Sequence, residues 1–170
     1  MGKPVIAAIN SAAAGGGMIP ALCADVRLAS DAAFFTTAFA QRGVIAENAM
    51  AWLLPRLVGP SRALEMMMSR RRVDAREALD IGLVNQVFPQ QCFRTEVQAY
   101  AARIATRVSP RSLAVIKRQV WKGVSQTYAE SLATADEEIV KAAESRDFVE
   151  GVAHLIEKRE PDFPDLDTAP

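Results

Sequence analysis

The sequence predicts an α/β fold over its first part, followed by a helical region. An apolar run at residues 5–9 (VIAAI) comes first, and the three glycines at 15–17 and a short helical pattern follow it. Strand-like segments recur up to residue 88, whereas the periodic segments after residue 91 have helical spacing. A strand that is apolar at every position is typical of a sheet covered on both faces, and this favours α/β layering.

The first elements are expected to be a strand, a short loop and a helix that begins at the glycines. The strand covers residues 5–9, and small residues at 10–14 form the loop. The helix covers residues 18–23 and contains Pro20. Proline is tolerated in the first turn of a helix but not in its interior, so the helix starts close to Gly16 or Gly17.

The rest of the α/β part alternates between extended and helical patterns. Extended segments are expected at 26–29, 33–37 and 83–88, and a helix is expected at 47–57. Another helix starts at Asp74, because Glu77 three residues later completes a pattern like a capping box. Gly82 suits the C-terminal cap of that helix.

The second part of the chain is expected to be helical. Ser109 as N-cap and Pro110 at the first helical position mark one helix start. Helices are expected at 92–107, 110–122, 125–144 and 146–158. The predicted organisation is therefore an α/β part at 1–90, a helical part at 91–160 and an irregular tail at 161–170.

The composition excludes several classes of function. Twenty basic and twenty acidic side chains leave no net charge, so a general basic surface for nucleic acid is absent. Two cysteines and one histidine do not make a disulfide framework or a histidine-rich zinc site. No apolar run approaches the roughly 20 residues that span a bilayer. We expect a cytoplasmic protein without a membrane span or a nucleic-acid partner.

The glycine turn has three interpretations that the residues alone leave open. A strand, three glycines and a helix start can present backbone N–H groups to an anion. The ligand could be a phosphate, although neither phosphate-binding glycine pattern is complete. It could instead be a carbonyl oxygen that gains negative charge in a reaction. In the third interpretation, the glycines only let the helix pack close to the strand.

Beyond these local patterns, a series of motifs resembles the crotonase family, the enoyl-CoA hydratases and isomerases. The motifs occur in the family's order over nearly the whole chain, at residues 3–10, 15–17, 24–29, 43–47, 54–59, 75–79, 82–84 and 157–159. The resemblance implies a spiral of ββα units, here partial, and a helical oligomerisation region that forms a trimer or a dimer of trimers. It also implies an acyl-CoA thioester substrate, with coenzyme A as part of that substrate and no separate cofactor. Roughly the first third of the family's domain has no counterpart in this sequence.

The resemblance assigns the glycine turn to the thioester carbonyl. It implies that the backbone N–H of Gly16 is one donor of an oxyanion hole, with Gly15 and Gly17 beside it in the substrate site. A helix start aimed at a carbonyl stabilises the enolate that forms when the neighbouring carbon loses a proton. The family's second donor belongs to an earlier loop without a counterpart here, and losing one donor typically costs about 10²–10³ in rate.

The same resemblance bears on the acid–base residue. Family hydratases carry glutamates at the positions that Ile19 and Phe39 occupy here, so a hydratase with two carboxylates is disfavoured. Some family isomerases carry their acid at the position of Glu47. One carboxylate suffices for isomerisation, because it removes a proton from C2 and returns it to C4. Ile19 and Phe39 would then form an apolar wall of the substrate site, and Trp52 could line the acyl pocket.

Two alternatives apply to these residues and three to the whole chain. A glutamate in the first turn of a helix, as expected for Glu47, is favourable in any protein, and Trp52 could simply fill the core. Beside Δ3,Δ2-enoyl-CoA isomerisation, the chain could be a hydratase. It could also be a non-catalytic subunit that binds acyl-CoA or assembles with others. A phosphate-binding module is the remaining alternative.

Overall fold

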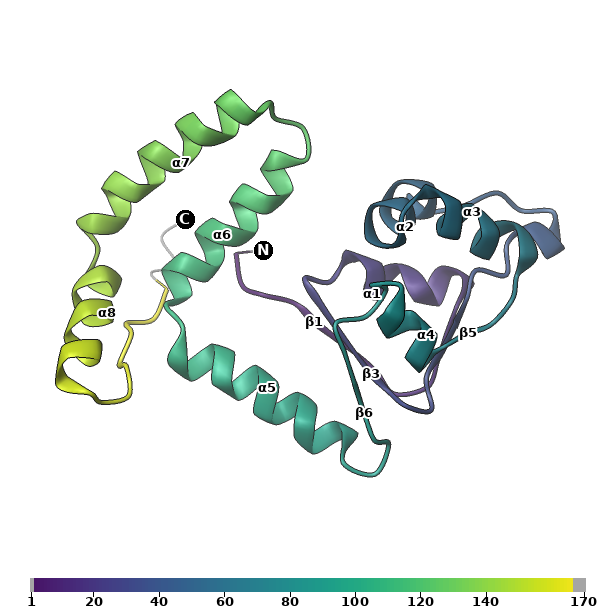
Figure 1. The fold of residues 1–170 in the computed structure, drawn as a ribbon, viewed down its shortest axis with the longest axis horizontal. Helices are drawn as coiled ribbons and strands as arrows, with labels where there is room; N and C mark the ends of the chain where they lie inside the picture. The colour runs from purple at the N-terminus through teal and green to yellow at the C-terminus, as the bar shows by residue number, and fades with distance from the viewer. Residues whose placement is uncertain (1, 167–170) are drawn as a thin grey trace. The chain divides into compact units, whose positions relative to one another are not determined.

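A computed structural model describes residues 2–166 of the chain, which forms two compact units (Figure 1). One unit is Val5–Gln98, and the other comprises the helical region from Ala99 onward with the residues before Val5. The division between them falls inside one helix. The sequence-based division into 1–90, 91–160 and 161–170 stays a prediction. Two compact units do not by themselves define domains, because compactness does not show that either unit folds alone. Residues 167–170 of the expected tail lie outside the described part.

The α/β unit contains two small sheets. The first consists of β1 (Ile6–Ile9), β3 (Val26–Ser30) and β6 (Gln86–Phe88), in the order β1-β3-β6 with both pairs parallel. Ile6 lies opposite Val26, and Leu28 lies opposite Gln86. The second sheet has the order β2-β4-β5, with bounds Ala12–Ala14, Phe34–Thr36 and Val73–Asp74. Its pair β2–β4 is parallel, and β4–β5 is antiparallel.

Short helices complete this unit and enclose its core. They are η1 (Gly15–Met18), α1 (Ile19–Cys23), η2 (Ala40–Arg42), α2 (Met50–Val58), α3 (Pro60–Ser69) and α4 (Ala75–Asp80), where η marks a 3₁₀ helix. Strands and helices contribute to one apolar cluster, whose fully buried members include Met18, Phe35, Leu54 and Met66. Full burial of one such side chain contributes about 1.5–3 kcal/mol, so this core is the main source of the unit's stability.

The helical region begins with α5 (Phe93–Arg107) and continues with α6 (Pro110–Gly123), α7 (Tyr128–Ala143) and α8 (Arg146–Glu157). Side-chain caps start the last three helices, because Ser109, Thr127 and Ser145 each accept a hydrogen bond from a backbone N–H in the first turn. None of the residues of α6, α7 or α8 is buried. The long apolar side chains of these three helices are therefore in contact with solvent in the isolated chain.

Several elements differ from the sequence-based expectation, among them α3, η2 and β5, whose ranges were not predicted, and the following three. Residues 12–14, expected in a loop, form β2, because they pair with β4 and not because of their own composition. The strand expected at 83–88 is shorter, since only Gln86–Phe88 pairs with β3. The helix expected at 47–57 begins at Met50, and Asn48 and Ala49 before it have left-handed backbones with φ of 49° and 61°. Such residues do not fit into an α-helix, so the expectation that Glu47 lies in the first turn was wrong.

Candidate active site

The three glycines differ in what their backbone requires. Gly15 has a left-handed φ of +51°, and an added Cβ would lie 3.5 Å from the carbonyl oxygen of Thr37. Gly16 and Gly17 do not have a positive φ, and a Cβ on either would meet no atom within 4 Å. Close packing of a helix on a strand therefore does not explain glycine at 16 and 17. Both residues are exposed, and a small residue there leaves room for an approaching ligand.

The glycines form the first turn of a continuous helical segment. The 3₁₀ helix η1 leads directly into α1, and the N–H of Ile19 donates to the carbonyl of Gly16. N–H groups in the first turn of a helix have no acceptor within the helix. Those of the exposed glycines can accordingly donate to a carbonyl or an anion that approaches from solvent.

The far end of this helical segment is held by Asp25 and Arg27. The Asp25 carboxylate accepts a hydrogen bond of 2.7 Å from the N–H of Val5, at the start of β1. Arg27 is 7% exposed, and its guanidinium donates to the carbonyls of Ala24 and Leu83, each at 2.8 Å. Burial lowers the pKa of Arg27, and the charge of Asp25 opposes that effect. Asp25 therefore ties the end of this helical segment to the start of β1.

Two buried hydroxyl groups secure the loops on either side of the glycines. Ser30 is fully buried and donates to the carbonyl of Asn10 at 3.0 Å, at the corner between β1 and β2. Thr37 is fully buried as well and donates to the carbonyl of Met66 at 3.0 Å. Sequence reasoning missed these two residues and Arg27. Apart from the contact of Arg27 with Ala24, their partners lie 20 to 56 residues away, and no local pattern indicates them.

Ile19 and Phe39, the positions where a family hydratase carries glutamate, both belong to the apolar interior. Phe39 is 8% exposed and is part of the core cluster, and Ile19 packs against that cluster. Phe39 also organises the turn after it, because its carbonyl accepts from the N–H groups of Arg42 and Val44. Gly43 completes the turn with a left-handed φ of 68°.

Glu47 lies in the loop between this turn and α2, and its side chain is exposed. Its carbonyl accepts a hydrogen bond of 3.0 Å from the N–H of Met50, so its backbone sets the start of α2. Ala46, the residue before it, packs against the same core that contains Phe39.

Trp52 lies on α2 and is 41% exposed, so it is not a core residue. The guanidinium carbon of Arg56 lies 3.9 Å from the centroid of the Trp52 ring, and Arg56 also donates to the Trp52 carbonyl at 2.9 Å. This cation–π contact covers part of the ring and restricts its motion. The sequence offered no signal for the pairing beyond the four-residue spacing on one helix face.

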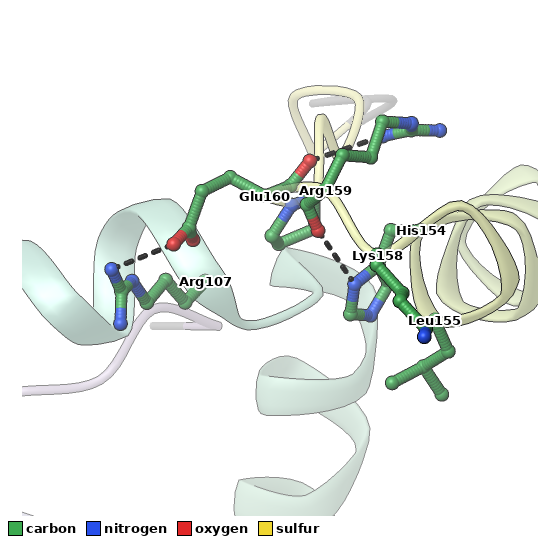
Figure 2. A pocket seen from close by; sticks show the side chains of 7 residues that line it. Arg107, His154, Leu155, Lys158, Arg159 and Glu160 are labelled. Atoms are coloured by element: carbon green, nitrogen blue, oxygen red, sulfur yellow. Dashed lines mark hydrogen bonds and ion pairs between the residues drawn. The ribbon is translucent and has the colours of Figure 1, made fainter.

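A surface pocket lies in the helical unit, at the end of α8 (Figure 2). This surface pocket has a volume of about 420 Å³, and its lining includes Arg107, His154, Lys158 and Arg159. Arg107 forms an ion pair of 2.8 Å with Glu160, and the carbonyl of Arg159 lies 3.4 Å from Nδ1 of His154 (Figure 2). Lys158 caps α8 in a left-handed conformation.

The fold and the glycine turn define an α/β protein in which exposed glycines form the first turn of a helical segment. The family model described as enoyl-CoA hydratase/isomerase matches residues 1–166, so the chain belongs to that family. The resemblance drawn from the motifs is thereby confirmed.

Some curated relatives are named hydratases and others isomerases. A probable enoyl-CoA hydratase of Mycobacterium tuberculosis is 39% identical over 166 residues, which are 96% of this chain and 58% of that protein. A 1,2-epoxyphenylacetyl-CoA isomerase of Escherichia coli is 32% identical over 161 residues, which are 95% of this chain and 61% of that protein. The chain thus spans about three fifths of the length of these relatives.

Solved structures agree on the fold. A probable enoyl-CoA hydratase/isomerase from Mycobacterium abscessus has a TM-score of 0.92 at 32% identity, and the match covers 98% of this chain and 65% of that one. An enoyl-CoA hydratase from Bacillus anthracis has a TM-score of 0.91 at 30% identity, with 95% and 62% covered. The predicted α/β fold of the crotonase type, with C-terminal helices, is confirmed.

Within residues 2–166, no helix combines the length and the apolar composition that a membrane span requires. The same residues contain no group of three or more His, Cys, Asp or Glu side chains placed to hold a metal ion.

Proposed function

We propose that the protein acts on acyl-CoA thioesters and moves the double bond of a 3-enoyl-CoA to the C2–C3 position. Glu47 removes a proton from C2, the electron pair enters the thioester as a dienolate, and the proton returns to C4. The N–H of Gly16 donates to the thioester oxygen while that oxygen carries negative charge. The proposal covers the whole protein's activity, since the chain spans about three fifths of its relatives.

The observation that carries this proposal is glycine at 16, where neither φ nor packing requires it. A side chain there would stand at the helix start that receives the thioester oxygen. The choice of isomerisation over hydration is supported by Ile19 and Phe39, which bring no carboxylate to the positions that hydration needs. Glu47 is then the carboxylate left for proton transfer in the family pattern, and its loop is held on the core by Ala46.

Hydration of a 2-enoyl-CoA is the second candidate, and the names of several relatives favour it. One experiment separates the two reactions. The purified chain is incubated with 3-enoyl-CoA and, separately, with 2-enoyl-CoA, and the products are resolved by chromatography and mass. A 2-enoyl-CoA product of unchanged mass from the first substrate supports isomerisation. Addition of one water to the second substrate contradicts it, and no turnover of either supports a non-catalytic subunit.

The role of Glu47 is tested by Glu47→Gln, with Glu137→Gln on α7 as a matched control. Loss of turnover is expected only for Glu47→Gln, because an amide cannot take up the proton. Binding of acyl-CoA, followed by calorimetry, should remain in both variants. Retained turnover in Glu47→Gln would remove this residue from the mechanism.

The proposal includes a homo-oligomer of the trimer type and a cytoplasmic location. Support for self-association comes from apolar side chains on α6, α7 and α8 that are more than half exposed, among them Val120, Ile139, Phe148 and Leu155. Exposed apolar side chains that recur along neighbouring helices are typical of a protein interface. The pocket at the end of α8 would take a phosphate group of coenzyme A, with Lys158 as the cation.

A further inference from the structure

The glycine turn and the loop that carries Glu47 leave the second sheet at the same edge. β2 and β4 are parallel neighbours, with Ala14 opposite Thr36. The chain beyond Ala14 continues into the glycine turn, whereas the chain beyond Thr36 continues through Phe39 to Glu47. Open α/β sheets place their ligands outside the carboxyl ends of parallel strands, and both segments start there. The relative position of the proposed donor and the proposed acid therefore depends on the end of β4.

The first residue after β4, Thr37, is fully buried, and its hydroxyl fixes this end of the strand to α3. The hydroxyl donates to the carbonyl of Met66 at 3.0 Å, in a buried hydrogen bond. Because α3 ends at Ser69, Met66 is one of its last four residues, whose carbonyls have no N–H partner within the helix. Thr37 thus supplies the donor that this buried carbonyl needs.

The main chain of Thr37 lies against the glycine turn. Its carbonyl oxygen is the atom that a Cβ on Gly15 would meet, at 3.5 Å, whereas a Cβ on Gly16 would meet no atom within 4 Å. Gly15 has a left-handed backbone, which leads the chain from β2 into η1. A displacement of Thr37 would therefore move Gly15, and Gly15 is bonded directly to the residue whose N–H is the proposed donor.

On its other side, Thr37 precedes a strained residue. Ala38 has a left-handed backbone with φ of 56°. This conformation is unfavourable for a residue with a Cβ, and it persists where the surrounding structure fixes the neighbouring residues. Thr37 is fully buried, and Phe39 belongs to the core cluster. Both neighbours of Ala38 are thus anchored, so the chain from β4 to the loop with Glu47 follows a closely fixed course.

We propose that Thr37 is a positioning residue for the reaction, because its buried hydroxyl holds the glycine turn and the loop with Glu47 at a fixed separation. It acts through Gly15 on the N–H of Gly16. This inference rests on the proposed function, which makes Gly16 the donor to the thioester oxygen. Donors stabilise a developing negative charge only when they are held in the right direction, and a displacement of about 1 Å can lower a rate about 100-fold.

Three variants test the role of the hydroxyl. Thr37→Val removes it and keeps the shape of the side chain, and kcat with 3-enoyl-CoA should fall about tenfold or more while KM stays within about twofold. Thr37→Ser keeps a hydroxyl and should recover most of the parent kcat. Thr36→Val is the matched control, because the Thr36 hydroxyl also donates to a carbonyl after α3, that of Arg70 at 3.1 Å, but at an exposed position. Its kcat should equal that of the parent.

A second measurement does not depend on turnover. In amide nuclear magnetic resonance spectra of the full chain, the Gly16 signal should move and its order parameter should fall in Thr37→Val, but not in Thr36→Val. Urea unfolding of each variant shows that the spectra come from folded protein. In the parent chain, where folding of a variant plays no part, titration with acyl-CoA should shift the Gly16 and Thr37 signals together and leave Thr36 in place.

Several results would overturn the proposal. They are a parent-like kcat or a parent-like Gly16 signal in Thr37→Val, an equal loss of kcat in Thr36→Val, and a Thr37→Ser variant as slow as Thr37→Val. A titration that shifts Gly16 without Thr37 would also contradict it. A parent chain that does not convert 3-enoyl-CoA contradicts the proposed function instead, and the Gly16 signal then still decides whether Thr37 holds the glycine turn.

Discussion

The α/β unit and the three last helices use their apolar residues in opposite ways. In Val5–Gln98, strands and helices direct theirs into one cluster with fully buried members such as Leu54 and Met66. In α6–α8 none of the residues is buried, although α8 alone presents Phe148, Val149, Leu155 and Ile156 with more than half of each side chain exposed. One unit buries its apolar side chains in a core of its own, whereas the other leaves many of them exposed in the described chain.

Paired leucine truncations should give the largest contrast between the two regions. Leu54→Ala removes a fully buried side chain and is expected to lower the free energy of unfolding by about 2–5 kcal/mol. Leu155 is 70% exposed, so Leu155→Ala should lower the free energy of unfolding by no more than about 0.5 kcal/mol. Urea unfolding of dilute protein measures both. Sedimentation at higher concentration should show weaker self-association for Leu155→Ala only, and equal unfolding losses would contradict the contrast.

The Arg27 contacts should be the next most sensitive feature. Arg27→Ala leaves the buried carbonyls of Ala24 and Leu83 without their donor, and each unpaired group costs about 1–3 kcal/mol. The expected loss of unfolding free energy is about 3 kcal/mol, measured in urea. Arg27→Lys keeps a cation but cannot donate to both carbonyls in the same geometry, so its loss should be intermediate. A loss below that of an exposed control such as Arg76→Ala would show that the contacts are unimportant.

These examples show which parts of the structure local sequence could predict. Caps at Asp74 and Ser109 were predicted because acceptor and donor lie three residues apart. β2 and the contact of Arg27 with Leu83 depend on partners 20 or more residues away. The start of α2 was misplaced because Ala49 gives no sign of a left-handed backbone and Asn48, a residue that tolerates one, gives only a weak sign. The family motifs gave the candidate site residues, but not the exposure of Glu47 or the cation–π contact of Trp52.

The glycine turn allows a comparison within the α/β unit. Substitution of Gly15 should change stability, whereas substitution of Gly16 should change function. Gly15→Ala places a Cβ on a left-handed backbone and should cost about 1 kcal/mol of unfolding free energy. Gly16→Ala meets no atom and should leave stability unchanged or raise it by about 0.5 kcal/mol. Acyl-CoA binding or turnover should fall for Gly16→Ala all the same. Unaltered turnover and binding in Gly16→Ala would favour the interpretation that the glycines have only a structural role.

The smallest expected effect is the pH dependence of the helical region. Arg159 hydrogen-bonds to the Glu150 carboxylate, with the N–H of Asp162 as a second donor, and these bonds lower the pKa of Glu150 from 4.5 to about 2. Because the folded pKa is depressed, the stabilisation is present above pH 4.5 and is lost as the pH falls towards 2. Glu150→Gln should therefore reduce the loss of helical circular dichroism between these pH values. The effect is small because the pair lies at the surface and is screened by salt. Glu137→Gln, at an exposed position on α7, serves as the control and should follow the parent curve. If the parent and Glu150→Gln lose helix equally over this range, the Arg159 contact contributes nothing to the stability of this region in solution.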